Sequence, residues 1–465
     1  MIDLIYLSLI FLTPGLFFSG LLKSQDNPFL TSSLSLFFWS FSTLIIPLNY
    51  LINSSTGNAF LILFLVLWAI KYFSFKNLFF NFALLIFIEL LNNHFGILHI
   101  VSTHAITLNA ALENLTYSSS NIPIPSIQTT FLKFFNESYI LASLPQFVGF
   151  SLLLGNLSLL IKSKKISKLT VLTILPIFTI FCVFLEIMSI RSHFVASQIL
   201  CLVLIETFFG KKINENVFIV MLSIFLISRL ENIYIYYPMI ILIITHYLNK
   251  NKDSLNSKFY VKLLAATISP LLINYYPLSG GDDIRFSLGF LICLIGLFNV
   301  LIYCKNFSIT RFVVDKFNLF FILGIILLGI VNFLLYDFKA IHSWLFLITH
   351  LLDTHQGWVL STILFIILIS YLISFEETKE NRQIYISIFL TLILILVSSP
   401  LQHSLYGGDQ WSSGIIDGIP IYNFYDESQT RSFLQLFLTV LPFGGLRIKK
   451  SKLKIISKLS NEYRF

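Results

Sequence analysis

The sequence predicts an all-α protein, a polytopic bundle of about 13–15 transmembrane helices that forms one integral membrane domain over residues 1–465. Of the 465 residues, 56% are hydrophobic and only 12% are charged, and the mean hydropathy is +0.83. An ordinary soluble domain carries about 25% charged residues. The apolar residues also run continuously for about 15–22 positions, close to the length of a membrane helix. A soluble enzyme, a disordered tail and a nucleic-acid-binding module are therefore excluded.

Each predicted helix is one of these apolar runs, and polar, basic or helix-breaking residues separate it from the next run. We expect helices over residues 2–22, 32–52, 58–71, 77–91, 138–161, 169–190, 194–210, 217–229, 232–248, 260–275, 286–303, 317–336, 358–374, 384–398 and 430–446.

Basic residues orient the predicted bundle, because the cytoplasmic loops of membrane proteins carry an excess of Lys and Arg. All but six of the 31 Lys and Arg residues fall in alternate turns or in the basic tail 447–465, which we assign to the cytoplasm. The net charge of +8 then reflects topology and requires no nucleic acid partner. We expect the N-terminus and the loops near residues 92–137, 337–357 and 399–429 to face outward from the plasma (inner) membrane.

Polar side chains gather on the predicted outer face, where all but one of the nine histidines map. In the 92–137 loop, Glu113 and His104 are the candidates for a catalytic general base. Two glycines precede the pair Asp282 and Asp283, which suits a divalent cation that also binds phosphate oxygens. An acidic helix N-cap is the alternative account of this aspartate pair.

Four hairpin tips on the same face carry an arginine at the mouth of a predicted helix. An arginine binds a phosphate group bidentately, so these tips are candidate sites for a diphosphate. The alternative is a set of solvated tips whose long side chains extend toward water. The residues considered for phosphate binding are Arg191, His193, Arg229, Glu231, Arg285 and Arg431.

The sequence Ile227-Ser228-Arg229-Leu230-Glu231-Asn232 resembles the R-x-E turn that is common in polytopic GT-C glycosyltransferases. These enzymes transfer sugars from polyprenyl-phosphate carriers. The stretch from Tyr425 to Arg431, followed by the last apolar run, is similar to the end of such chains. The family usually carries an acidic motif in its first outer loop. Here the first sizeable outer loop follows the fourth predicted helix, and Glu113 is its main carboxylate.

The resemblance implies a membrane glycosyltransferase that acts in cell-envelope glycan assembly. The polyprenyl-linked donor would bury its tail between helices while Arg229, Arg191 or Arg285 binds its phosphate. Glu113 would take the proton from an acceptor hydroxyl, on a glycan, lipid or protein, as the oxygen attacks the anomeric carbon. No nucleotide-binding motif is present, and a divalent cation is the only cofactor to consider.

Two other functions fit the same pattern. An O-antigen ligase or polymerase also works on lipid-linked glycans, and the histidine-rich residues 342–358 are similar to the long-loop region of those enzymes. A transporter or flippase of lipid-linked or small polar substrates would show related halves and charges at mid-membrane depth. Here the charges cluster at one predicted surface and no repeat is evident, so transport ranks below the two enzyme classes. A non-catalytic membrane scaffold is the remaining class.

Overall fold

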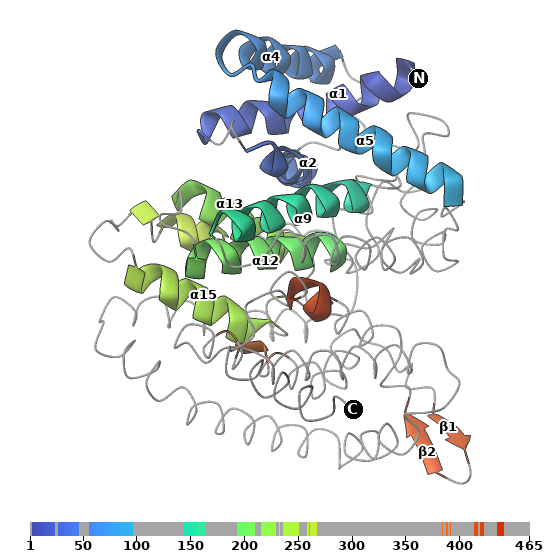
Figure 1. Cartoon of the computed structure of the whole chain (residues 1–465), viewed down its shortest axis with the longest axis vertical. Helices are drawn as coiled ribbons and strands as arrows, with labels where there is room; N and C mark the ends of the chain where they lie inside the picture. Colours follow the sequence, from blue (N-terminus) through green and yellow to red (C-terminus); the bar gives the residue numbers. More distant parts are fainter. Residues whose placement is uncertain are drawn as a thin grey trace, which may run out of the picture.

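The computed structural model is helical throughout the part of the chain that it describes, apart from one β-hairpin (Figure 1). This confirms the predicted all-α class for that part, with the hairpin as an exception. The described residues are 2–23, 27–45, 55–95, 144–163, 193–209, 215–228, 232, 236–250, 258–259, 261–266, 384, 387–388, 391, 413–416, 419–422 and 435–440. The helices expected at 169–190, 286–303, 317–336 and 358–374 lie outside these residues.

The helices follow the predicted apolar runs closely. They are α1 (Ile2–Leu21), the short 3-10 helix η1 (Pro28–Leu30), α2 (Thr31–Ile45), α4 (Ser55–Lys71), α5 (Phe75–Phe95), α9 (Leu144–Lys162), α12 (His193–Phe209), α13 (Glu215–Ser228) and α15 (Tyr237–Lys250). Within the described ranges, no helix combines the length and the apolar character needed to cross a membrane.

The structure departs from the predicted outer loops in two places, and the first is a wrong boundary. The helix α5 continues to Phe95, so the first loop cannot begin at residue 92. The residues Asn92, Asn93 and His94 end the apolar run, but none of them breaks a helix, and the helical hydrogen bonds continue through them.

The second departure is the hairpin inside the 399–429 loop, where no strand was predicted. Strands β1 (Ser413–Ile416) and β2 (Ile419–Tyr422) pair antiparallel, with Ser413 opposite Tyr422. The two residues between them in the sequence are Asp417-Gly418, a dipeptide typical of a two-residue hairpin turn.

The described helices stack in successive layers, each packed on the next (Figure 1). The helix α1 packs between α4 and α2, and α2 in turn contacts α9 and α13. The helix α9 packs along α12, which also contacts α13 and α15. One continuous hydrophobic core runs through these layers and includes the fully buried aromatic residues Trp39, Phe147 and Phe225.

The contact between α1 and α2 is built around Pro14, which lies inside α1 and has no N–H to donate. The backbone N–H of Gly15 donates to Ser35 Oγ (3.0 Å), and Trp39 Nε1 donates to the carbonyl of Phe11 (3.2 Å). Side chains of α2 therefore bind the backbone groups of α1 around the proline. A Cβ on Gly15 would lie 2.1 Å from the Thr31 carbonyl oxygen, so only glycine permits this close approach.

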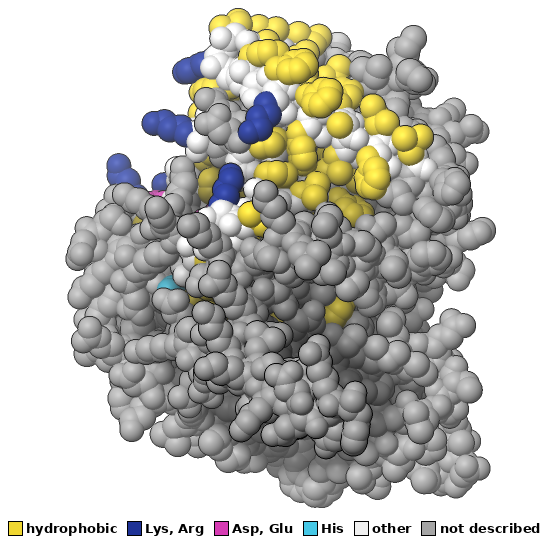
Figure 2. Space-filling model, viewed as in Figure 1, with side chains coloured by type: hydrophobic (Ala, Val, Ile, Leu, Met, Phe, Trp, Pro, Cys, Tyr) yellow, Lys and Arg dark blue, Asp and Glu magenta, His cyan; other side chains and the backbone are white. Residues whose placement is uncertain are grey.

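The outer helices expose large apolar side chains. On α4, Ile62 is 62% exposed and Ile70 is 79% exposed, and on α5 Phe79 is 63% exposed. Figure 2 shows apolar side chains over much of the described surface that α4 and α5 form. The interior holds small polar residues among its apolar side chains, since Ser33 and Ser35 of α2 are fully buried. Apolar residues thus face outward on α4 and α5 as well as filling the core, and small polar residues also lie between helices.

Candidate functional site

Hydrogen bonds between buried amide and hydroxyl side chains join α9, α12 and the helical residues 435–440. Asn156 Nδ2 of α9 donates to the carbonyl oxygen of Gln198 (2.9 Å) and to its Oε1 (3.2 Å). Gln198 Nε2 donates to the carbonyl oxygen of Leu438 (3.0 Å). Thr439 Oγ1 donates to the carbonyl oxygen of Ser197 (3.2 Å). Because these polar side chains are fully buried, each bond replaces one to water and fixes the helices in register.

The same network includes the C-terminal end of α13. Phe225 provides one of the last carbonyl groups of this helix, which have no partner within the helix itself. Its oxygen accepts from Ser228 Oγ (2.7 Å) and from Asn232 Nδ2 (2.8 Å). Gln435 Nε2 donates to Asn232 Oδ1 (2.9 Å). Asn232, beyond the end of α13, is therefore joined to the helical residues 435–440 by a buried amide pair.

The residues that make these contacts follow three of the four predicted arginine tips closely in the sequence. Asn232 directly follows Glu231 in the sequence, and Gln435 lies four residues after Arg431. The helix α12, which carries Ser197 and Gln198, begins at His193, two residues after Arg191. Described residues that follow Arg229 and Arg431 in the sequence are therefore hydrogen-bonded to each other, and Ser197, six positions after Arg191, is bonded to the same helical residues 435–440. All four arginines themselves, and the residues around Arg285, lie outside the described part of the chain.

Of the predicted site residues, only His193 lies in the described part of the chain, as the first residue of α12. Among the described residues, no three His, Cys, Asp or Glu side chains gather into a group that could hold a metal ion. The predicted site residues that lie outside the described part are His104, Glu113, Arg191, Arg229, Glu231, Asp282, Asp283, Arg285 and Arg431.

The hydrogen-bonded side chains of this network are amides and hydroxyls without an ionisable group, so their role is to position the helices. One hydrogen-bond acceptor of the network, Asn156 Oδ1, is buried and has no hydrogen-bond partner among the described residues. A buried polar atom without a partner costs about 1–3 kcal/mol. An inserted hydroxyl or water would satisfy it.

Sequence reasoning selected charged residues as site candidates and missed Asn156, Gln198 and Gln435. The signal that identifies them is an uncharged amide inside an otherwise apolar run. An amide at such a position is costly to bury unless it is hydrogen-bonded, and it commonly bonds across helices.

No protein family model, curated protein or solved structure matches the chain. The function is therefore inferred from the residues and contacts of this chain alone.

Proposed function

We propose that the chain is a polytopic integral protein of the plasma membrane, and that it transfers a sugar from a polyprenyl-phosphate carrier at the outer membrane face. The membrane location is supported by the composition and by the exposed apolar faces of α4 and α5. Six side chains of α4 from Phe60 to Ile70 are 40% to 79% exposed and all are large and apolar. Water does not solvate such a surface favourably, whereas lipid chains do.

The observation that carries the transferase proposal is the hydrogen-bonded pair Asn232–Gln435, together with the bonds from α12 to Leu438 and Thr439. These bonds hold Asn232, which follows the R-x-E sequence, together with the first turns of α12 and the helical residues 435–440. We propose that Arg229, Arg191 and Arg431, which precede these residues in the sequence, bind the phosphate of the carrier and stabilise its charge as it leaves the sugar. Glu113 is the proposed general base, and the acceptor is a glycan, lipid or protein hydroxyl.

A complementation experiment tests this proposal. Cells that lack the gene should accumulate the lipid-linked donor and lose one envelope glycan, as measured by mass spectrometry of both fractions. The wild-type chain and the variant Arg447→Ala should restore the glycan, whereas Arg229→Ala and Glu113→Ala should not. Arg447 is the matched control because it is an arginine of the predicted cytoplasmic tail.

Equal amounts of each variant in the membrane fraction are the control for folding. The transferase proposal fails if deletion leaves both fractions unchanged, or if Arg229→Ala and Glu113→Ala restore the glycan as well as the wild-type chain does.

A further inference from the structure

A cavity of about 680 Å³ opens where four elements meet: the end of α1, the short helix η1, the start of α5 and the end of α9. Its lining combines phenylalanine rings with lysine side chains. The lining includes Phe29, Phe75, Phe79, Lys23, Lys76 and Lys162.

The apolar wall of the cavity opens to the outside of the bundle. The rings of Phe75 and Phe79 stack with centroids 5.9 Å apart, and the two side chains are 67% and 63% exposed. Behind them, Phe29 packs edge-on against Phe80 with centroids 4.8 Å apart. The wall is therefore continuous with the exposed apolar face of α5 (Figure 2).

The inner end of the cavity is held in place by η1. The Pro28 carbonyl oxygen accepts from Asn81 Nδ2 (3.2 Å), and the Phe29 carbonyl oxygen accepts from Ser151 Oγ (3.1 Å). The helix α9 comes close because residue 155 is glycine, and a Cβ there would lie 2.8 Å from Phe29 Cβ. The cavity is thus a built feature with hydrogen-bonded walls.

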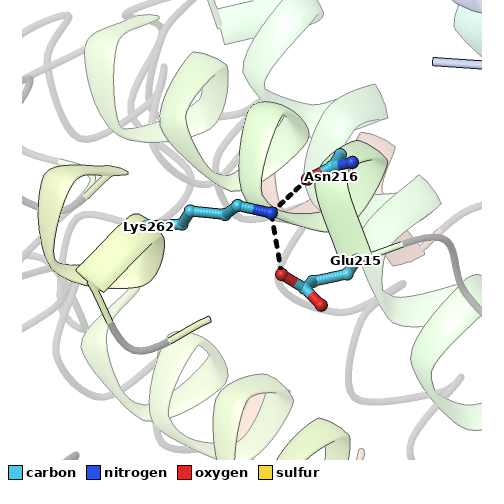
Figure 3. Close-up of polar contacts among 3 residues, drawn as sticks. All are labelled: Glu215, Asn216 and Lys262. Atoms are coloured by element: carbon cyan, nitrogen blue, oxygen red, sulfur yellow. Dashed lines mark hydrogen bonds and ion pairs between the residues drawn. The ribbon is translucent and has the colours of Figure 1, made fainter. Parts of the chain in front are cut away.

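The three lysines of the cavity are exposed, and none has a carboxylate within ion-pair distance among the described residues. Two other lysines differ. Lys262 Nζ donates to Glu215 Oε1 (3.0 Å) and to Asn216 Oδ1 (2.7 Å) (Figure 3), and Lys71 Nζ lies 5.5 Å from the ring centroid of Tyr72. The cavity therefore concentrates positive charge that the described part of the protein does not neutralise.

Lys23 has an unusual backbone as well. It follows the end of α1 with a φ of 55°, the left-handed conformation that glycine usually adopts at a helix end. Its N–H donates to the carbonyl oxygen of Gly20 (3.0 Å). A lysine at this position places a cation at the rim of the cavity, although its backbone conformation is less favourable for lysine than for glycine.

We propose that this cavity binds the phosphate head group of an anionic phospholipid, with Lys23, Lys76 and Lys162 around the phosphate and the acyl chains along Phe75 and Phe79. The inference rests on the proposed membrane location and is independent of the proposed sugar transfer. Three cations complement a phosphate, and the open phenylalanine wall complements a chain attached to it. The charge pattern predicts the cytoplasmic side for these lysines, where anionic lipids concentrate.

The test uses the purified full chain in a zwitterionic detergent, with thermal unfolding as the readout. Phosphatidylglycerol, phosphatidylcholine and inorganic phosphate are titrated separately. We expect phosphatidylglycerol alone to raise the melting temperature. Each Lys→Gln change in the cavity should weaken the apparent affinity about fivefold, and the triple variant about a hundredfold. Lys71→Gln is the matched control and should bind as the wild type does.

Lys23→Gly provides a second variant, because glycine keeps the left-handed turn and removes only the side chain. It should fold as well as the wild type and still bind phosphatidylglycerol about fivefold more weakly. The proposal is overturned if the triple variant binds as the wild type does, if phosphatidylcholine binds equally well, or if inorganic phosphate alone accounts for the shift. Recovery of the chain without detergent in the soluble fraction would instead contradict the membrane location.

Discussion

The free-energy cost of placing a charge on the exposed face of α4 shows whether that face contacts lipid or water. Ile62 is 62% exposed and lies near the middle of this helix. In a membrane, Ile at the centre of a helix favours insertion by about 0.5 kcal/mol, whereas Asp opposes it by about 3 kcal/mol. Ile62→Asp should therefore cost about 3–4 kcal/mol. In water, an exposed substitution away from special features changes stability by about 0.5 kcal/mol or less.

The assay compares the folded, membrane-inserted fraction of Ile62→Asp with that of Ser55→Asp, which adds the same charge at the exposed first residue of the same helix. A cost of about 3 kcal/mol lowers the folded-to-unfolded ratio more than a hundredfold. Fluorescence-detected size exclusion after mild solubilisation should show loss of the Ile62→Asp peak and retention of the Ser55→Asp peak. Equal peaks and equal melting temperatures for both variants would refute the reasoning, because they would mean that this face contacts water.

Three further substitutions test the packing and the network, each by thermal unfolding in lipid nanodiscs. Gly15→Ala should destabilise the fold by about 1–3 kcal/mol, because the new Cβ would meet the Thr31 carbonyl oxygen at 2.1 Å and backbone atoms cannot rotate away; an unchanged melting temperature would mean that α1 and α2 are not so close. Gln435→Leu should cost about 1 kcal/mol, because it removes the bond to Asn232 Oδ1, and a stabilised variant would argue against that bond. Lys262→Ala should cost less than about 1 kcal/mol, since its ion pair with Glu215 is 45% and 30% exposed; a larger loss would indicate a role beyond a surface contact.

Hydropathy predicts the helices well because the length and polarity of an apolar run are local properties. The first helix was expected at 2–22 and is observed at Ile2–Leu21. The prediction is wrong where polar residues continue a helix, as at Asn92–His94, because it took the end of the apolar run as the end of the helix. It also missed the hairpin around Asp417-Gly418, because a search for long apolar runs does not register a short turn signal.

The candidate sites are less predictable, because they depend on which helices become neighbours. The pair Asn232–Gln435 joins residues 203 positions apart in the sequence, and no local pattern links them. The lysines of the cavity were already noted in the sequence, but there the predicted membrane orientation accounted for them and no binding site was inferred. Their convergence with Phe29 depends on Gly155, whose missing side chain lets α9 approach η1.

The central claim, that the apolar faces of α4 and α5 lie in lipid, is tested most directly by spin labelling. Single nitroxides at Leu63 and Phe87, which are 50% and 49% exposed, are placed in a chain whose four native cysteines are replaced, and the protein is reconstituted into liposomes. We predict frequent collisions with dissolved oxygen and few with a water-soluble nickel complex, and the reverse for a label at Lys76. Collisions with the nickel complex as frequent at Leu63 and Phe87 as at Lys76 would contradict the account.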